Sequence, residues 1–161
     1  MDTNSYSCGD IVRYRRDIPP AHYSFKIEAF SLLSDTKAEK IESGIFEAGG
    51  YKWRMVLFPN GNAKSNGKDF VSLYLAIEET KSLPQRWEVK AEIKLFVFDH
   101  KENNYLTVQG KQWFSKEDNS WGYRNTIRLG DLHEKSKGFV MNDTLIVEAQ
   151  ITLVSVTKFS P

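Results

Sequence analysis

GGYKWRMVLFPNG, at residues 49–61, is the stretch of this sequence that decides its fold. Side chains in its middle alternate between two faces, and one face carries Tyr51, Trp53, Met55 and Leu57. A period of two is typical of a half-buried β-strand, and Gly-Gly and Pro-Asn-Gly are typical turn sequences. The stretch therefore predicts a strand between two turns, with Trp53 in the hydrophobic core.

Similar short segments follow one another along the chain, separated by turn signals. We predict extended structure at residues 22–28, 43–47, 51–58, 70–77, 87–97, 105–109, 121–129 and 145–153. One helical turn is expected at residues 129–134. Seven or eight short strands with almost no helix indicate an all-β fold, an antiparallel β-sandwich. The segment 70–77 is apolar on both faces, which indicates either burial on both sides or one face in a ligand groove.

The length of 161 residues is enough for one domain with short extensions. Three arginines, Arg13, Arg15 and Arg16, precede Pro19-Pro20 without any hydrophobic period, so a solvated tail is favoured there over a targeting or phosphate contact. Deleting residues 1–18 is then expected to leave the melting temperature nearly unchanged. The expected organisation is a flexible leader at 1–19, a domain at 20–157 and a tail at 158–161.

Charge and cysteine content exclude several classes of function. The 22 Lys and Arg nearly balance the 21 Asp and Glu, which argues against binding nucleic acid through bulk charge. The single cysteine, Cys8, allows neither an internal disulfide nor a multi-cysteine zinc site. No apolar run approaches membrane-spanning length, so no membrane partner is expected. The expected location is a reduced compartment, the cytoplasm or the nucleus.

Motifs for catalysis and metal binding are missing from the sequence. The three histidines, His22, His100 and His133, lie in separate segments without metal-ligand spacing. Asp99 and Glu102 are predicted to be solvated turn residues rather than a catalytic pair. We therefore expect no enzyme activity, no metal and no cofactor.

Aromatic residues in polar surroundings are the better candidates for function. Trp113-Phe114 and Trp121-Gly122-Tyr123 are surrounded by Lys, Gln, Glu, Asp and Asn. Such residues fit either a satellite core or a recognition surface, because Trp and Tyr offer a large contact area and a hydrogen-bonding group. A sheet edge beside exposed aromatics would suit an extended peptide, which gains affinity from main-chain bonds.

Several sequence blocks resemble a MATH domain, the meprin and TRAF-homology family, and are most similar to plant TRAF-like proteins. The blocks occur in the family's order across roughly residues 20–157, at 22–30, 49–53, 58–62, 71–75, 121–123 and 138–145. The resemblance implies an eight-stranded antiparallel β-sandwich of the TRAF-like fold, with one short helical turn and no catalytic activity. It also implies a shallow groove for a short linear peptide of a protein partner, as used by ubiquitin-linked adaptors and by receptor signalling proteins.

Carried over position by position, the resemblance implies a peptide-binding set of Tyr74, Trp113, Ser120, Trp121, Gly122 and Tyr123. We expect the aromatic side chains of this set to line one continuous groove. Ser120 stands where the family usually has Asp, and Val56 where some members have Arg. The bound peptide is therefore expected to be anchored by apolar and hydroxyl-bearing side chains.

Two other functions stay open from the sequence. Exposed Trp and Tyr also stack on sugars, so the first alternative is a carbohydrate-binding β-sandwich. The second is a structural MATH domain without groove function, because Ser120 and Val56 depart from the family's pattern. Trimeric family members use a neighbouring coiled coil, and since none is present here, a monomer is expected.

Overall fold

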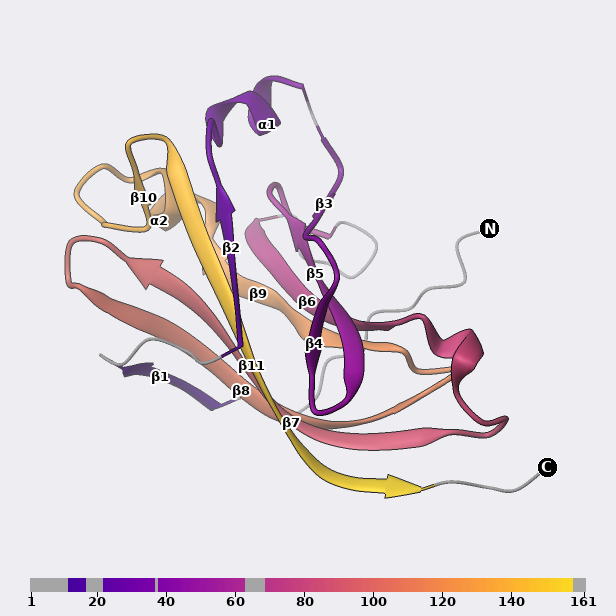
Figure 1. The fold of residues 1–161 in the computed structure, drawn as a ribbon. Helices are drawn as coiled ribbons and strands as arrows, with labels where there is room; N and C mark the ends of the chain where they lie inside the picture. Colours follow the sequence, from indigo (N-terminus) through magenta and orange to yellow (C-terminus); the bar gives the residue numbers. More distant parts are fainter. Residues whose placement is uncertain (1–11, 17–21, 37, 63–68, 158–161) are drawn as a thin grey trace.

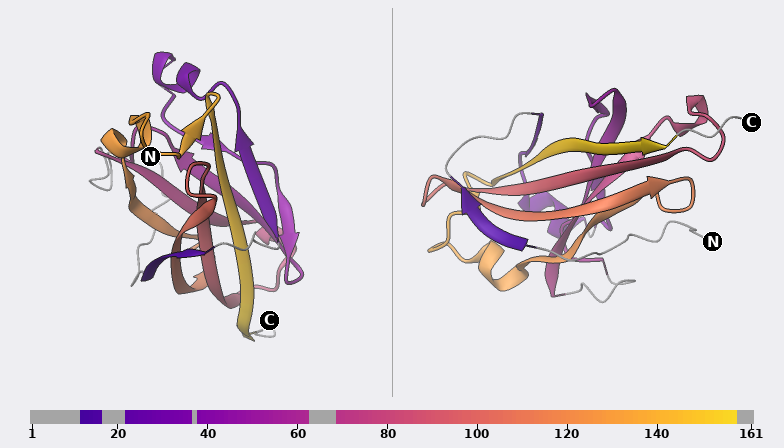
Figure 2. Two further views of the ribbon diagram at one scale, coloured as in Figure 1. Left: turned by 90° about the vertical axis from the view of Figure 1, so that its left-hand side faces the viewer. Right: turned by 90° about the horizontal axis from the view of Figure 1, so that it is seen from below.

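The computed structural model describes residues 12–16, 22–36, 38–62 and 69–157, so the expected tail at 158–161 lies outside the described residues. Two antiparallel sheets pack face to face (Figures 1 and 2). The six-stranded sheet contains β1 (Val12–Arg16), β8 (Asn104–Ser115), β7 (Glu88–Asp99), β11 (Thr144–Thr157) and β10 (Val140–Met141) in that order, with β2 (Tyr23–Ile27) beside β11. The five-stranded sheet contains β3 (Ile41–Glu42), β5 (Tyr51–Phe58), β6 (Phe70–Glu78) and β9 (Ser120–Arg128), with β4 (Phe46–Ala48) beside β5.

β5 has the limits and the faces that its sequence predicts. Trp53, Met55 and Leu57 are completely buried between the sheets. The Trp53 indole Nε1 donates a hydrogen bond to the Ala48 carbonyl at 2.9 Å, and its ring meets the Phe114 ring edge to face at 5.1 Å. The prediction that Trp53 belongs to the core is confirmed.

The β-sandwich is confirmed, but its two sheets contain more strands than the eight expected, because β1 and the two-residue strands β3 and β10 lie outside the predicted segments. The predicted helical turn is α2 (Leu129–His133). A second helix, α1 (Ser31–Asp35), and the 3₁₀ turn η2 (Thr80–Ser82) were not expected.

α1 begins where a distant carboxylate binds its first residue. Asp143 Oδ1 accepts a hydrogen bond from the Ser31 N–H at 2.9 Å, and Asp143 Oδ2 accepts one from the Ser31 hydroxyl at 2.7 Å. Asp143 itself lies in the β10–β11 turn, where it and Asn142 both have positive φ. Such a turn joins two antiparallel strands tightly. The start of α1 thus depends on a hairpin near the other end of the chain, which no local pattern reveals.

The first strand corrects the expected domain boundary. β1 pairs with β8 along its whole length, from Val12 opposite Gln109 to Arg16 opposite Tyr105. The expectation of a flexible leader is therefore wrong for residues 12–16, which extend the six-stranded sheet. The rest of that expected leader, apart from these five residues, lies outside the described part of the chain.

Candidate functional site

β9 is the first element to consider as a binding site, because it ends the five-stranded sheet. Among the described strands, β9 pairs with β6 on one side and with none on the other. Edge strands present backbone N–H and C=O groups that an added strand can pair with. Four of the six residues expected at the groove, Ser120, Trp121, Gly122 and Tyr123, lie on this strand.

Tyr74 and Gly122 face each other on the outer side of this sheet. They are directly paired in the β6–β9 ladder. A Cβ added to Gly122 would lie 2.2 Å from the Leu73 carbonyl oxygen and 2.5 Å from the Tyr74 Cα. Only glycine therefore allows β9 to approach β6 this closely. Ser120 lies on the same side, opposite Ala76, and is also buried.

Tyr74 is completely buried although it points away from the sandwich core. Together with Val56 and Phe58 it forms a small apolar cluster on the outer face. The Phe58 ring meets its ring edge to face at 5.7 Å, and the Asn62 amide nitrogen donates to its hydroxyl at 3.3 Å. The two-faced apolar pattern of β6 therefore reflects burial on both sides, one of the two readings that the sequence left open.

Trp121 and Tyr123 point to the inner side of the same sheet. They are paired with Leu75 and Leu73, and cross-strand partners share a face. Trp121 is completely buried in the main core, against which Tyr123 packs. The Trp121 indole N–H has no acceptor among the described residues. Trp121 is thus a core residue and cannot form the wall of a surface groove.

Trp113 lies on the other sheet. Its neighbour in β8, Phe114, is buried in the core, so Trp113 projects from the outer face of the six-stranded sheet, where it is 40% exposed. The Lys90 ammonium lies 5.8 Å from its ring centroid, in a cation–π contact.

The expectation that these aromatics line one continuous groove is therefore wrong in its geometry. The structure brings together Tyr74, Ser120 and Gly122, which share the outer face of the five-stranded sheet. Trp121 and Tyr123 face the core, and Trp113 belongs to another surface. The sequence could not reveal this arrangement, because facing depends on the ladder register between distant strands.

β9 carries an arch that the sequence did not predict. The β6–β9 register passes from Val71 opposite Ile127 to Leu73 opposite Tyr123, so residues 124–126 lie opposite Ser72 alone. The Ser72 hydroxyl donates to the Arg124 carbonyl at 2.7 Å and accepts from the Asn62 N–H at 2.9 Å. The Thr126 hydroxyl donates to the Tyr123 carbonyl at 2.8 Å. Two hydroxyl groups thus hold the arch in one shape.

A pocket of about 330 Å³ opens beside the arch. Its polar side chains include Asn125, Arg128, Asp131 and Lys137, and its apolar floor includes Leu106, Ile127 and Phe139. The Arg128 guanidinium lies 5.4 Å from the Phe70 ring centroid. The only sign of this pocket in the sequence is the pair Asn125-Thr126 after an apolar stretch of the strand. Such polar pairs are too common in strands to identify a pocket.

Charged side chains border the Tyr74 cluster on the outer face. Arg54 lies 3.7 Å from carboxylate oxygens of both Glu42 and Glu78. Partial burial is the largest effect on Glu78 and raises the pKa of its carboxyl group, while Arg54 opposes this and the charges of Glu42 and Glu79 add to it. Lys52 pairs with Glu79 at 2.9 Å at the exposed end of the row. The face beside β9 is therefore more charged than Val56 and Ser120 alone suggest.

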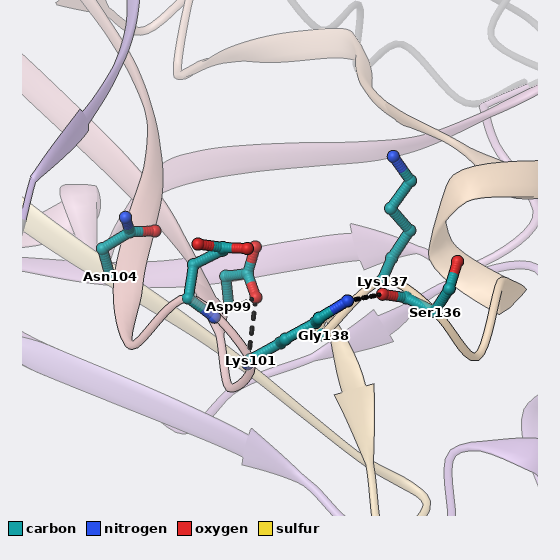
Figure 3. Close-up of a pocket in the computed structure, with 7 residues that line it drawn as sticks. Asp99, Lys101, Asn104, Ser136, Lys137 and Gly138 are labelled. Atoms are coloured by element: carbon teal, nitrogen blue, oxygen red, sulfur yellow. Dashed lines mark hydrogen bonds between the residues drawn. The ribbon is translucent and has the colours of Figure 1, made fainter.

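A polar pocket of about 450 Å³ lies at the tip of the β7–β8 hairpin (Figure 3). Asp99 is buried there, and its Oδ1 accepts hydrogen bonds from the N–H groups of Lys101 at 3.1 Å and Glu102 at 3.0 Å. Lys101 Nζ donates to the Ser136 carbonyl at 2.9 Å. Asp99 is thus a turn residue as predicted, but it is not solvated. The Asp99 bonds close the hairpin tip, and the Lys101 bond joins this tip to the loop before β10.

Within the described ranges, no group of three or more His, Cys, Asp or Glu side chains is placed to hold a metal ion. None of the described helices is both long enough and apolar enough to cross a membrane.

The fold and the site define an antiparallel β-sandwich with an arched edge strand beside a mixed polar and apolar pocket. The family model of the MATH domain matches residues 22–151, and the chain belongs to this family of protein-interaction modules. The resemblance of the sequence blocks to this family is confirmed.

The relatives are plant proteins much longer than this chain. Ubiquitin C-terminal hydrolase 12 of Arabidopsis thaliana is 31% identical over 144 residues, which are 89% of this chain and 12% of the hydrolase. Ubiquitin C-terminal hydrolase 13 of the same species is 29% identical over the same length and shares. A MATH domain and coiled-coil domain-containing protein of this species is 32% identical over 125 residues, 77% of this chain and 37% of the relative.

Proposed function

We propose that this chain recognises a short extended segment of a partner protein, which adds to the sheet as a strand beside β9. The observation that carries the proposal is the edge position of β9 together with its fixed arch. Main-chain hydrogen bonds would supply affinity, and a pocket beside the strand would supply specificity. An arch that is already held by hydroxyl groups costs little ordering entropy when a ligand binds.

The composition of the site suggests which segment it takes. The pocket at Asn125 and Arg128 combines an apolar floor with amide and charged groups, which suits a hydroxyl-bearing or small polar side chain. Because the ladder and the proposed ligand side chain are both uncharged, so that no charge pair forms with the ligand, binding should depend only weakly on salt concentration. In this proposal Tyr74 supports the edge strand from the outer face and Trp121 from the core side, and neither touches the ligand.

The cellular role is proposed from the relatives. Two of them carry the name ubiquitin C-terminal hydrolase. We propose that this chain selects partners or substrates in a ubiquitin-linked or signalling pathway of the cytoplasm or nucleus, without catalytic activity of its own.

A peptide library displayed on phage, screened against the 161-residue chain, tests the proposal. Selected peptides are then titrated into isotope-labelled protein, and the amide shifts are mapped by NMR. Strand addition predicts shifts concentrated in β9 and around Arg128, and loss of binding when the peptide backbone is N-methylated at its ladder positions. Arg128→Ala should weaken binding, whereas Lys111→Ala, on the exposed face of β8, should not.

Two results of these experiments would contradict strand addition at β9. Shifts centred on Trp113, or a glycan array that yields ligands while the peptide library yields none, would overturn the proposal. The second result would favour the carbohydrate-binding alternative.

A further inference from the structure

The C-terminal half of β11 forms a second open edge of the sandwich. β2 pairs with β11 only from Leu145 to Ala149, whereas β7 pairs with β11 as far as Thr157. From Gln150 onward, β11 therefore has a ladder on one side only within the described ranges. The side chains of Thr152, Val154, Ser155 and Val156 are all exposed, so this edge is accessible.

Backbone groups on this edge point outward. The Ile151 N–H donates to Nδ1 of His22 at 2.9 Å, just where β2 begins. Successive N–H groups of a strand point to alternate sides, so the Leu153 N–H points to the same side of β11 as the Ile151 N–H. β2 does not extend as far as Leu153. A bulge between Leu153 and Ser155 bends the strand here but does not end its pairing with β7.

The side chains of this edge lack the usual protection. Residues 151–157 read Ile-Thr-Leu-Val-Ser-Val-Thr, a run with high β propensity and no charge or proline. Val154 is 51% and Val156 39% exposed. Natural edge strands normally carry lysine, other charges or proline, because an unprotected edge pairs with another chain. The bulge is the one protective feature of this segment.

Four of the other edges are charged or short, and β2, which forms the edge beside the first half of β11, carries Lys26. β9 carries Arg124 and Arg128, and β1 reads Val-Arg-Tyr-Arg-Arg. β3 and β4 have two and three residues and include Glu42 and Glu47. If two copies of the chain paired through one of these edges across a two-fold axis, like charges would lie opposite each other, which is unfavourable. The β11 edge, in contrast, meets a copy of itself without charge repulsion.

We propose that two copies of this chain associate through antiparallel pairing of β11 at residues 151–157. The pairing is isologous, with the two-fold axis near Val154, and it joins two six-stranded sheets into one. This association differs from the monomer that we expected from the sequence.

The dimer leaves the β9 edge open, because the two edges lie on opposite sides of the sandwich. Leu153 on β11 packs at Gly49, in the β4–β5 turn. Tyr23 on β2 stacks on Phe46 of β4 at 4.4 Å. β9 instead lies beside β8, since Leu106 and Ile127 line one pocket. A dimer would therefore carry two separate β9 edges.

Sedimentation equilibrium of the 161-residue chain over a wide concentration range tests this proposal. The mass of the natural chain should rise from one copy towards two as its concentration increases. The double variant Val154→Lys/Val156→Lys should raise the dimer Kd by at least about tenfold, because like charges then face each other across the axis. The matched control is Leu32→Lys/Met141→Lys, which changes two exposed apolar residues elsewhere and should dimerise like the natural chain.

Hydrogen exchange provides a second measurement that does not depend on a variant. Amides of residues 151–157 should become more protected as protein concentration increases. A natural chain that stays one copy at every concentration, or a Val154→Lys/Val156→Lys variant that dimerises as well as the natural chain, would overturn the proposal. So would protection that appears only when a selected peptide is added, since β11 would then accept a partner strand and not a second copy.

Discussion

The two open edges of this sandwich differ in almost every property that governs strand pairing. The β9 edge is arched, held by the hydroxyl groups of Ser72 and Thr126, and bordered by arginines and a pocket. The β11 edge at residues 151–157 is uncharged, β-branched and exposed. Shape and charge restrict the partners of an edge, while a uniform neutral edge leaves its pairing weakly specified. One domain can thus combine a selective edge and a permissive one.

The largest effect is expected inside the β9 edge. Trp121→Ala should lower the free energy of unfolding by about 3–5 kcal/mol, because it removes a completely buried aromatic side chain from the core. Urea unfolding followed by circular dichroism measures the change. Trp113→Ala is the control and should cost less than about 1 kcal/mol, since Trp113 lies partly exposed outside the core and its removal takes away the cation–π contact with Lys90. Equal losses for the two variants would contradict the assignment of Trp121 to the core.

The close approach of β9 to β6 gives the next largest effect. Gly122→Ala should destabilise the protein by about 3 kcal/mol, at the upper end of the range for overpacking, because the new methyl group meets the backbone of Leu73 and Tyr74. Gly130→Ala is matched to it, since beyond its chain neighbours and the backbone of its own helix no atom lies within 4 Å of its added Cβ. Thermal unfolding of both variants separates the two cases. A Gly122→Ala protein as stable as the natural chain would show that β9 can shift without loss.

The hydroxyl group that holds the arch should have a smaller effect. Ser72→Ala should cost about 1–2 kcal/mol, because the partly buried Arg124 carbonyl and the buried Asn62 N–H both lose their bond to the Ser72 hydroxyl. Faster hydrogen exchange at residues 124–126 should accompany the loss in urea unfolding. Ser155→Ala, on the exposed β11 edge, should change neither measurement. Unchanged exchange in Ser72→Ala would mean that the arch does not depend on this hydroxyl.

The smallest effect is expected on the charged face beside β9, which has no counterpart along the β11 edge. The pKa of Glu78 is raised, so the folded protein binds the proton of the Glu78 carboxyl group more tightly than the unfolded chain does. Its contribution to stability is therefore present below the ordinary pKa of 4.5 and lost as the pH rises through the folded-state pKa.

Glu78→Gln should accordingly stabilise the protein by a few tenths of a kcal/mol at pH 7, and the gain should vanish as the pH falls below about 4. Urea unfolding of the variant and of the natural chain at several pH values measures this gain in stability. Glu102→Gln, on the exposed hairpin tip, serves as control. A loss of stability at pH 7 would mean that the ion pair with Arg54 outweighs the cost of burial.

Strand positions followed from local patterns, but facing and pairing did not. The alternation in β5 is sufficient to predict its limits and the burial of Trp53, and α2 lies where its short apolar pattern predicts. β1 was missed because its five residues contain three arginines, and what makes them a strand is the distant partner β8. α1 was missed for the same reason, since it depends on Asp143.

The expected groove was wrong because aromatic content does not report which side of a sheet a residue faces. The β6–β9 ladder pairs Tyr74 with Gly122 and Trp121 with Leu75, the residue after Tyr74. Tyr74 and Trp121 therefore lie on opposite faces of the sheet. The arch of β9 could not be predicted either, because it depends on Ser72, a residue of the neighbouring strand. The local sequence therefore identified β9, the strand of the candidate site, but not its shape.

The position of β11 has a consequence for how this protein is made. β11 lies between β2 and β7, so the first and last thirds of the chain meet in the middle of one sheet. The bond between Ser31 and Asp143 also spans 112 residues. During synthesis, β2 and β7 therefore leave the ribosome before β11, the strand that pairs with both of them, has been made. Non-local pairing of this kind slows folding and exposes unpaired strands. Nascent chains that stop before residue 144 should accordingly bind chaperones, and folding should begin only after β11 has emerged.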